Sequence, residues 1–542
     1  MISAGTKTDA QLSRWFAALT IAVLAVSASL SGLNNGFALD DVQIIAQNER
    51  IHSLAGAWRI FVETYWPPES GGSLYRPLTS LSFAIQWAIG GGSPLPFHVF
   101  SIALYAAVCV AFLRFTEAIA EARTAWLAAG LFAVHPVHVE AVANVVGQAE
   151  LWSALCALLA LTLYVRGRAA GTMSVTRVAG ISGLFAAGLM FKEHVIVLPA
   201  ILLALELVVV RRGSVAVTAI PNGRRLVSWI GIVAVSFVML RAGVIGSVHG
   251  GGTSPIFADD SFATRLFTML RVMLEWIRLF FWPSVLSADY SPSRIEIAET
   301  FALDMIPAVV VVSGVAMLAV FIRKTSPVAT FAIAWTGTAL LIPSNLLVVT
   351  GFVLAERTLF LASAGVMVAC AVAIVALVRM SIADGNHGMS SLITVGVAAL
   401  LVLGIARSST RNPVWRDNAT LITQTVEDAP TSARARMMLA QLNIDRGKPA
   451  RALAESGVAL MLGPKWDPQL YAFAGDVYQM NQKCDTATEL YARSLSLWPE
   501  QPQVRVNAAV CLLRTGRRAQ AKALLSDAGA FRLDVTGSDG DE

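Results

Sequence analysis

The sequence predicts an all-α membrane protein that ends in a solenoid of paired helices. Hydrophobic residues make up 56% of the 542 residues and charged residues only 14%, which is more apolar surface than one globular core can bury. Long apolar runs alternate with short polar segments up to about residue 410. From Ala433 onward the composition changes to helix-forming residues with a period near 34.

The first apolar run covers Trp15 to Leu33. It follows basic residues and ends in small ones, so a cleaved signal peptide is one interpretation. We expect a transmembrane helix instead, because the run is nearly long enough to cross a core of about 30 Å and many spans follow.

Further runs of spanning length predict about eleven crossings in total. They begin near Phe97, Ala125, Val142, Val178, Val195, Leu226, Phe301, Val328, Thr358 and Leu392. Lys and Arg flank alternate ends of these runs, which places the N-terminus in the cytoplasm and the C-terminus outside it. Residues 34–96 and 247–300 then form large extracytoplasmic loops. The same placement explains the net charge of +5 without a nucleic-acid partner.

The stretch from Arg265 to Pro283 could change this parity. Arg271, Glu275 and Arg278 follow each other at i, i+4 and i+7, which puts them on one helical face. This pattern favours an amphipathic helix lying in the membrane interface. If the segment spanned instead, everything after it would move to the cytoplasm.

The C-terminal part divides into a linker over 411–432, repeats over 433–530 and a disordered acidic tail over 531–542. Ala452, Ala487 and Ala521 recur at near-constant spacing, and each follows Gly447, Gln482 or Gly516 by five residues. Such a period is typical of tetratricopeptide repeats, with an ordinary helical bundle as the alternative. Cys484 and Cys511 fall in adjacent repeats, where a disulfide is allowed but not indicated.

With this topology, unusual polar groups of several segments gather on one membrane face. They are Asp40 and Asp41, then His135, His138 and Glu140, then Lys192, Glu193 and His194, then Asp289, and finally Glu356 and Arg357. Charges at membrane depth cost several kcal/mol unless they pair or meet water. The pattern therefore predicts a shared polar cavity.

Asp40 and Asp41 are the candidate catalytic groups. Either they are solvated loop acids, or one is a general base whose pKa is raised by burial and by its neighbour. A base is what a hydroxyl nucleophile needs when it attacks an anomeric carbon in one inverting step.

The other polar groups are candidates for binding a phosphate-linked sugar. "HPVHVE" lacks the i, i+4 histidine spacing of helical zinc sites, so we expect no cofactor, and a divalent metal is not indicated. Lys192, His194 and Arg357 could donate to an anionic leaving group, or each could merely pair with a neighbouring acid. Asp289 has the alternative of a solvated loop residue.

Six segments resemble the transmembrane and tetratricopeptide-repeat O-mannosyltransferases, which are membrane glycosyltransferases of the GT-C superfamily. These are "FALDDVQII", "YRPLTSLSF", "FAVHPVHVEAVANVVGQAEL", "FKEH", "SADYS" and "AERTLFLAS". The resemblance implies a GT-C fold over 1–410, a polyprenyl-phosphate-mannose donor and transfer to Ser or Thr of proteins outside the cytoplasm. It assigns the base to the first-loop acids, with Asp40 favoured, and the repeats would present the acceptor.

Some residues depart from the family pattern. The family usually has Arg at the position of Gln148, and an aromatic and a Pro at those of Phe360 and Ala362. A glycan or lipid acceptor, or a non-enzymatic membrane scaffold that recruits partners through its repeats, therefore stay as alternatives. Composition favours a bacterial plasma membrane over an endoplasmic reticulum.

Overall fold

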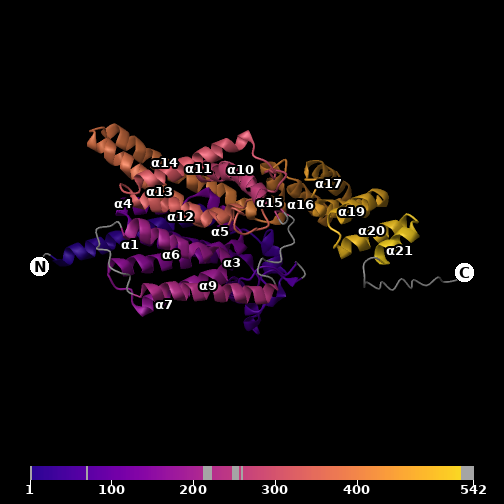
Figure 1. Cartoon of the computed structure of the whole chain (residues 1–542), viewed down its shortest axis with the longest axis horizontal. Helices are drawn as coiled ribbons and strands as arrows, with labels where there is room; N and C mark the ends of the chain where they lie inside the picture. The colour runs from indigo at the N-terminus through magenta and orange to yellow at the C-terminus, as the bar shows by residue number, and fades with distance from the viewer. Residues whose placement is uncertain (1–2, 69–70, 212–221, 247–255, 258–259, 527–542) are drawn as a thin grey trace. The chain divides into compact units, whose positions relative to one another are not determined.

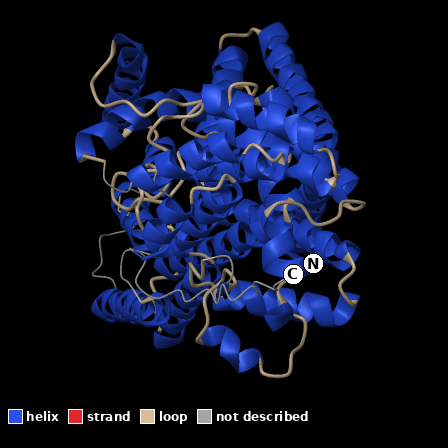
Figure 2. Ribbon diagram, turned by 90° about the vertical axis from the view of Figure 1, so that its right-hand side faces the viewer, coloured by secondary structure: helices blue, strands red, loops and turns tan. Residues whose placement is uncertain are grey.

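The structure is a computed structural model that describes residues 3–68, 71–211, 222–246, 256–257 and 260–526. Throughout these ranges the regular structure is helical and no strand occurs (Figure 2), which confirms the predicted all-α class. The chain forms two compact units: unit 1 is Met1–Ala288 with Ile297–Leu421, and unit 2 is Asp289–Glu296 with Ile422–Glu542. The predicted tail over 531–542 lies outside the described residues.

Unit 1 is a bundle of long apolar helices. In the part of the chain that is described, 8 helices are long and apolar enough to span a membrane, and the bent pair Ala122–Ala133 and Pro136–Ala143 allows a ninth. Two further apolar helices, α7 (Val175–Phe191) and α12 (Pro327–Leu340), are shorter, so the count of about eleven crossings stays a prediction. The chain is thus a multi-pass membrane protein.

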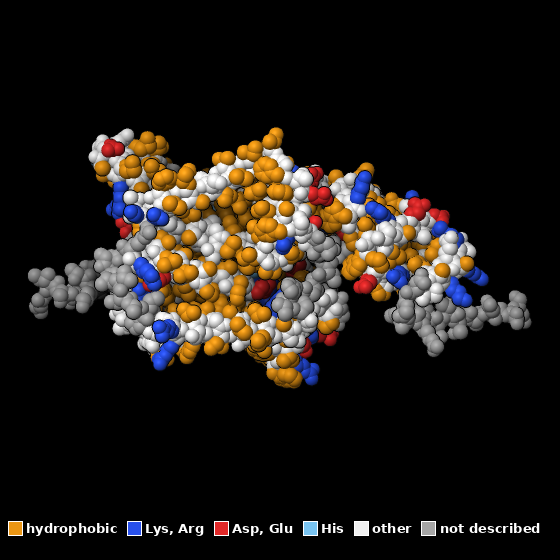
Figure 3. Space-filling model, viewed as in Figure 1, with side chains coloured by type: hydrophobic (Ala, Val, Ile, Leu, Met, Phe, Trp, Pro, Cys, Tyr) orange, Lys and Arg blue, Asp and Glu red, His pale blue; other side chains and the backbone are white. Residues whose placement is uncertain are grey.

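The bundle is assembled around α3. The helices named in the argument below are α1 (Ser3–Ser29), α2 (Pro77–Gly90), α3 (Pro94–Ile119), α4 (Ala122–Ala133), α5 (Val139–Ala143), α6 (Gln148–Ala169), α8 (Leu198–Leu205), α9 (Gly223–Ile245), α11 (Ile306–Ile322), α13 (Phe360–Ala383) and α14 (His387–Arg411). α3 contacts α1, α4 and α6, and these helices run side by side (Figure 1). Apolar side chains cover most of the visible face between the helix ends (Figure 3).

The ends of several helices are set by local sequence signals. Proline stands in the first turn of α2, α3 and α12, where its missing N–H costs nothing. The side chains of Ser174 and Asn386 accept backbone N–H groups at the starts of α7 and α14. Short 3-10 helices interrupt the long ones, including η8 (Glu193–Val197) and η11 (Glu356–Leu359). These two interruptions carry Glu193, His194, Glu356 and Arg357.

The segment that could have changed the topology forms α10 (Phe262–Phe281). Its buried residues lie on one face and include Thr268, Val272 and Trp276, while Arg271 pairs with Asp304 at 2.8 Å. The structure confirms an amphipathic helix, and α10 is not among the helices suited to span a membrane. Its location in the interface stays a prediction.

Unit 2 consists of paired helices. After α15 (Asn418–Asp428) come α16 (Ala433–Asp445), α17 (Pro449–Leu462), α18 (Pro468–Met480), α19 (Cys484–Leu497), α20 (Pro502–Arg514) and α21 (Arg518–Ser526). Most of residues 411–432 is helical, so the stretch predicted as a linker is folded structure instead. It follows that the boundary after Leu421 lies within a helix.

The recurring residues of the predicted repeats have defined roles in unit 2. Ala452, Ala487 and Ala521 are buried between helices. Gly447, Gln482 and Gly516 each end a turn between paired helices with φ of +66°, +60° and +78°, the left-handed region that favours glycine. The sequence period therefore marks one turn and one close helix contact per repeat.

Candidate active site

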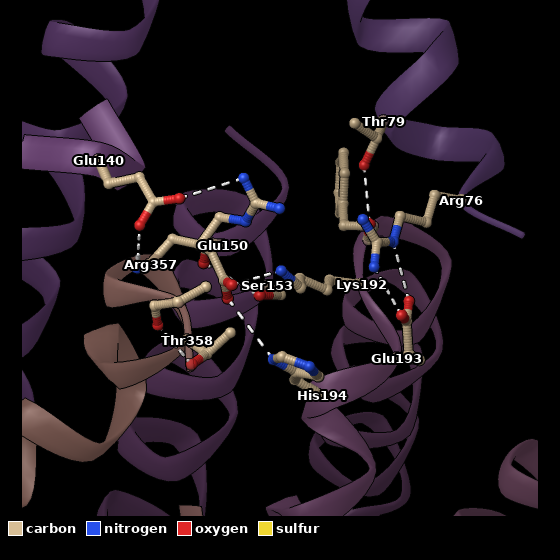
Figure 4. A network of polar contacts seen from close by, with 12 residues as sticks. Arg76, Thr79, Glu140, Glu150, Ser153, Lys192, Glu193, His194, Arg357 and Thr358 are labelled. Carbon is tan, nitrogen blue, oxygen red and sulfur yellow. Dashed lines mark hydrogen bonds and ion pairs between the residues drawn. The ribbon is translucent and has the colours of Figure 1, made fainter. Parts of the chain in front are cut away.

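Charged side chains of distant segments meet where the helices of unit 1 are interrupted. Figure 4 shows three groups of contacts, which are Glu140 with Arg357, Arg76 with Glu193 and, between them, Glu150 with Lys192 and His194. We call these residues together with Asp40 the polar network. The predicted gathering of charges is therefore present for four of the five segments, and the structure adds Arg76 and Glu150 to it.

Arg357 connects the first loop to the bundle. It lies in the first turn of η11, where its backbone N–H donates to Glu140 Oε2 at 2.9 Å, and its Nη1 donates to Glu140 Oε1 at 3.2 Å. Its Nη2 lies 3.3 Å from Asp40 Oδ2. The side chains of Asp40 and Arg357 stay 27% and 24% exposed, so both remain accessible to a substrate while Glu140 is buried.

The side chain of Asp41, unlike that of Asp40, is buried. It is 1% exposed, and its two carboxylate oxygens accept the backbone N–H groups of Val145 at 3.0 Å and Val146 at 2.8 Å. Burial raises the pKa of Asp41 to about 7, with the neighbouring charge of Asp40 adding to the rise and the two N–H groups opposing it. Asp41 therefore anchors the first loop to the turn before α6.

The backbone just before the two acids is held in an uncommon conformation. Leu39 has φ of +49°, which is strained for a residue with a side chain. Its N–H donates to Asn418 Oδ1 at 2.6 Å, and the N–H of Gly36 donates to the carbonyl of Arg416 at 2.8 Å. The segment after α14 thus fixes the directions in which Asp40 and Asp41 point.

Glu150 lies in the first turn of α6, where the positive end of the helix dipole favours an anion. Lys192 Nζ donates to Glu150 Oε1, and His194 Nδ1 lies 3.8 Å from Glu150 Oε2. Lys192 is 4% exposed. Lys192 is therefore paired with an acid, as one alternative predicted, although the acid is Glu150 rather than the adjacent Glu193.

Glu193 pairs with Arg76 instead. The Arg76 guanidinium binds it in two-pronged fashion, with Nε–Oε2 at 2.9 Å and Nη2–Oε1 at 2.6 Å. The ring of Tyr65 packs 5.2 Å from the same guanidinium. The Tyr65 hydroxyl is buried without a hydrogen-bond partner among the described residues, and burial raises its pKa.

The two histidines are bound elsewhere and make no hydrogen bond to the polar network within the described chain. His135 Nε2 lies 3.0 Å from the carbonyl of Phe280. His138 lies between the hydroxyls of Tyr105, at 2.9 Å, and Ser363, at 2.8 Å. Both histidines therefore connect segments of unit 1 through hydrogen bonds of their own.

Glu356 and Asp289 also make hydrogen bonds that stabilise local structure. Glu356 is buried and accepts the backbone N–H of Ser287 at 2.6 Å. Asp289 belongs to unit 2, where its Oδ2 accepts the hydroxyls of Ser432 at 2.6 Å and Ser291 at 2.7 Å. Ser432 caps α16, so Asp289 supports the first repeat and belongs to unit 2.

Gln148, a departure from the family pattern, has a local explanation. Its side-chain amide and that of Gln86 exchange hydrogen bonds of 2.8 and 2.9 Å, and Ser101 accepts a further one. The polar position is thus satisfied without a charge. Among the residues described, no group of three His, Cys, Asp or Glu side chains is arranged to hold a metal ion.

Three residues near the polar network were not among the predicted site residues. Arg76 and Glu150 stand in the segments "YRPL" and "GQAEL", where a charge next to an apolar helix start was the available signal. Tyr65 gave no such signal, because an aromatic residue in a loop is common.

Fold and network define a class: a multi-pass membrane protein whose interrupted helices carry a paired charge network and whose chain continues into helical repeats. A tetratricopeptide-repeat family model matches residues 480–534. This match confirms the repeat interpretation for that part of unit 2.

Curated proteins similar to this chain carry the name protein O-mannosyl-transferase. The chain is 27% identical over 383 residues to TMTC3 of Mus musculus, which covers 65% of this chain and 41% of the mouse protein. It is 24% identical over 458 residues to a Caenorhabditis elegans protein of that name, covering 83% and 63%. It is 32% identical over 290 residues to Drosophila melanogaster Tmtc2, covering 51% and 30%.

The chain thus spans between 30% and 63% of the length of these relatives. The matches confirm the resemblance to the transmembrane and tetratricopeptide-repeat O-mannosyltransferases that the six sequence segments indicate.

Proposed function

We propose that the chain is an inverting glycosyltransferase that transfers mannose from a polyprenyl-phosphate donor to Ser or Thr hydroxyls of proteins on the extracytoplasmic side of the membrane. The polar network is the observation that carries this proposal. It gathers an accessible acid and several cations where helices break, in a chain similar to named protein O-mannosyl-transferases.

Asp40 is the proposed base. It takes the proton of the acceptor hydroxyl while the oxygen attacks the anomeric carbon from the face opposite the phosphate. The bond between that carbon and the phosphate oxygen breaks, and its electron pair stays on the phosphate. The exposure of Asp40 and the commitment of both Asp41 oxygens to backbone N–H groups support this choice.

Lys192, His194 and Arg357 are the proposed donors to the phosphate. Lys192 and Arg357 are each paired with carboxylates in the structure, Lys192 with Glu150 and Arg357 with Glu140 and Asp40. An arriving phosphate would bind to the N–H groups that these carboxylates leave open, or replace a carboxylate. Loss of Arg357 from Asp40 would also leave the Asp40 carboxylate open to the acceptor hydroxyl.

The test compares Asp40→Asn and Asp41→Asn in membranes supplied with polyprenyl-phosphate-mannose and a Ser/Thr peptide. We expect Asp40→Asn to lower kcat about 100-fold or more, because a positioned base contributes about that much, with donor binding retained. Asp384→Asn, at an exposed helix end, is the matched control. Full activity of Asp40→Asn would exclude the base assignment.

The acceptor is tested separately by comparing glycopeptides of exported proteins from cells with and without this chain. Loss of protein-linked mannose is expected. Unchanged protein glycosylation with altered glycans or lipids would support the alternative acceptor class. If substitutions in the polar network left the cellular phenotype intact while repeat substitutions abolished it, the scaffold alternative would hold instead.

A further inference from the structure

A cavity of about 480 Å³ lies between α1, α3 and α6, away from the polar network. Its wall is formed by small and aliphatic side chains, including Ala106, Ala107 and Leu159, and two arginines, Arg114 and Arg166, complete it. No part of the proposed reaction uses these residues.

The hollow follows from side-chain size. Ala106, Ala107, Val110 and Ala111 are spaced so that they share one face of α3. Alanines at these positions leave a space beside α6 that larger residues would fill. Ala107 and Leu159 are exposed, so the cavity is a groove that opens on the outer surface of the bundle, which in a membrane faces lipid.

The two arginines lie near the C-terminal ends of their helices, and hence at the same end of the groove. Arg114 is partly engaged, with Nη1 at 2.9 Å from Glu117 and Nη2 donating to the carbonyl of Arg14 at 3.0 Å. The Arg166 guanidinium is exposed and makes no hydrogen bond or ion pair with any described residue. An apolar groove thus ends at a positive charge that is free to bind.

We propose that this groove holds one anionic phospholipid, with an acyl chain along the alanine face and the head-group phosphate on Arg166 and Arg114. Basic pockets between transmembrane helices bind anionic head groups in this way. Guanidinium groups suit the purpose because they bind phosphate with paired N–H groups. On the predicted topology, the head group lies in the cytoplasmic leaflet.

The site is separate from the proposed reaction centre. Arg166 follows Glu150 by 16 residues on α6, which corresponds to about 24 Å along the helix axis. A phosphate held at Arg166 is therefore not the phosphate that leaves the sugar, and the inference does not rest on the proposed activity.

Native mass spectrometry of the detergent-purified full chain tests the head-group contact. Phosphatidylglycerol and phosphatidylcholine with the same acyl chains are added in equal amounts. We expect wild type to retain phosphatidylglycerol about fivefold better, which corresponds to about 1 kcal/mol from one surface arginine, Arg166, since Arg114 is already paired with Glu117. Arg166→Gln should abolish that preference. Arg123→Gln, an exposed arginine at the start of α4 outside the groove, should keep it.

A second pair of variants tests the groove. Ala107→Phe fills it and should lower retention of phosphatidylglycerol several-fold, whereas Ala103→Phe, exposed on the same helix but outside the cavity, should not. Equal retention by these two variants, or no lipid preference in wild type, overturns the proposal. Displacement of phosphatidylglycerol by an equal amount of polyprenyl phosphate would overturn the assigned lipid class.

Discussion

Two adjacent carboxylates have different surroundings at the residue scale. Asp40 meets a guanidinium and solvent, whereas Asp41 is buried against two backbone N–H groups. The sequence marks both as candidate catalytic groups, and only the family resemblance favours Asp40. The difference in their surroundings arises from Arg357 and Val145, which lie far along the chain. Their side-chain environments assign accessibility to Asp40 and anchoring to Asp41.

The raised pKa of Asp41 leads to a prediction about pH. Because burial raises this pKa to about 7, the folded state still holds a proton that an unfolded aspartate loses near its usual value of 3.8. Stability is therefore lost as the pH rises through that interval. We expect the denaturation temperature in detergent to fall more between pH 5 and pH 8 for wild type than for Asp41→Asn. Identical pH dependence of the two proteins would contradict this.

The unpartnered Tyr65 hydroxyl leads to a second prediction. Tyr65→Phe keeps the ring on Arg76 and removes only a buried group without a partner, so stability should be unchanged or slightly higher. If bound substrate supplies the missing partner, activity should fall about tenfold, the value of one hydrogen bond.

Tyr75→Phe is the control, because the Tyr75 hydroxyl already donates to the carbonyl of Phe61 at 2.9 Å. This variant should melt at a lower temperature and affect the rate less. A fully active Tyr65→Phe enzyme would remove Tyr65 from the reaction.

At the scale of elements, close helix contacts in unit 2 depend on single small residues. A Cβ on Gly475 of α18 would lie 2.4 Å from a ring carbon of Tyr491 of α19, whereas a Cβ on Gly457 of α17 would meet nothing within 4 Å. The hydroxyl of Tyr491 is bound to Asp476 at 2.7 Å, so the ring cannot easily move away. The repeat contact therefore tolerates no side chain at Gly475.

We expect Gly475→Ala to destabilise unit 2 by about 1–3 kcal/mol through overpacking. Gly457→Ala should be neutral or stabilising by up to about 1 kcal/mol, because alanine restricts the unfolded chain and favours helix. Thermal unfolding followed by protease sensitivity within residues 433–526 distinguishes the two. Equal melting of both variants would show that α18 and α19 are not packed as described.

The turns between helices give a related prediction. Gln482 occupies a left-handed conformation that Gly447 and Gly516 occupy in the neighbouring repeats. Gln482→Gly should therefore raise the stability of unit 2 by up to about 1 kcal/mol, because the cost of a side chain at positive φ is removed. Met480→Gly, at the exposed last residue of the helix before the turn, should lower it by a similar amount. The denaturant midpoints of the two variants measure both effects.

At the scale of the whole molecule, sequence patterns predicted what is periodic and missed what depends on distant partners. Apolar runs and the 34-residue period identify the helices and the repeats because each signal is local. The ion pair between Glu140 and Arg357 joins residues 217 positions apart, and no spacing rule connects them. Asp289 is a second example. It was predicted to join the polar cavity, but it belongs to unit 2, and no spacing rule connects it to its distant partner Ser432.

Protease cleavage tests the hydrogen bonds that hold Asp289 in unit 2. Asp289→Ala removes the acceptor of the Ser432 and Ser291 hydroxyls, so residues 289–296 should detach more often. We expect trypsin to cleave after Arg294 several times faster than in wild type, as mass spectrometry of the fragments would show. Glu299→Ala, exposed just beyond this segment, is the control. An unchanged cleavage rate would mean that other contacts hold the segment.

The hydrogen bond between Ser432 and Asp289 also has a consequence for biosynthesis. Asp289 and Ser432 are separated by 143 residues, so Asp289 is translated well before the serine that binds it. At about 5–20 residues per second, the delay is on the order of ten seconds. During that time the hydroxyl of Ser432 is not yet available to Asp289. A chain truncated after Leu421 would lack Ser432, so removal of the repeats would also remove a hydrogen-bond partner of residues 289–296.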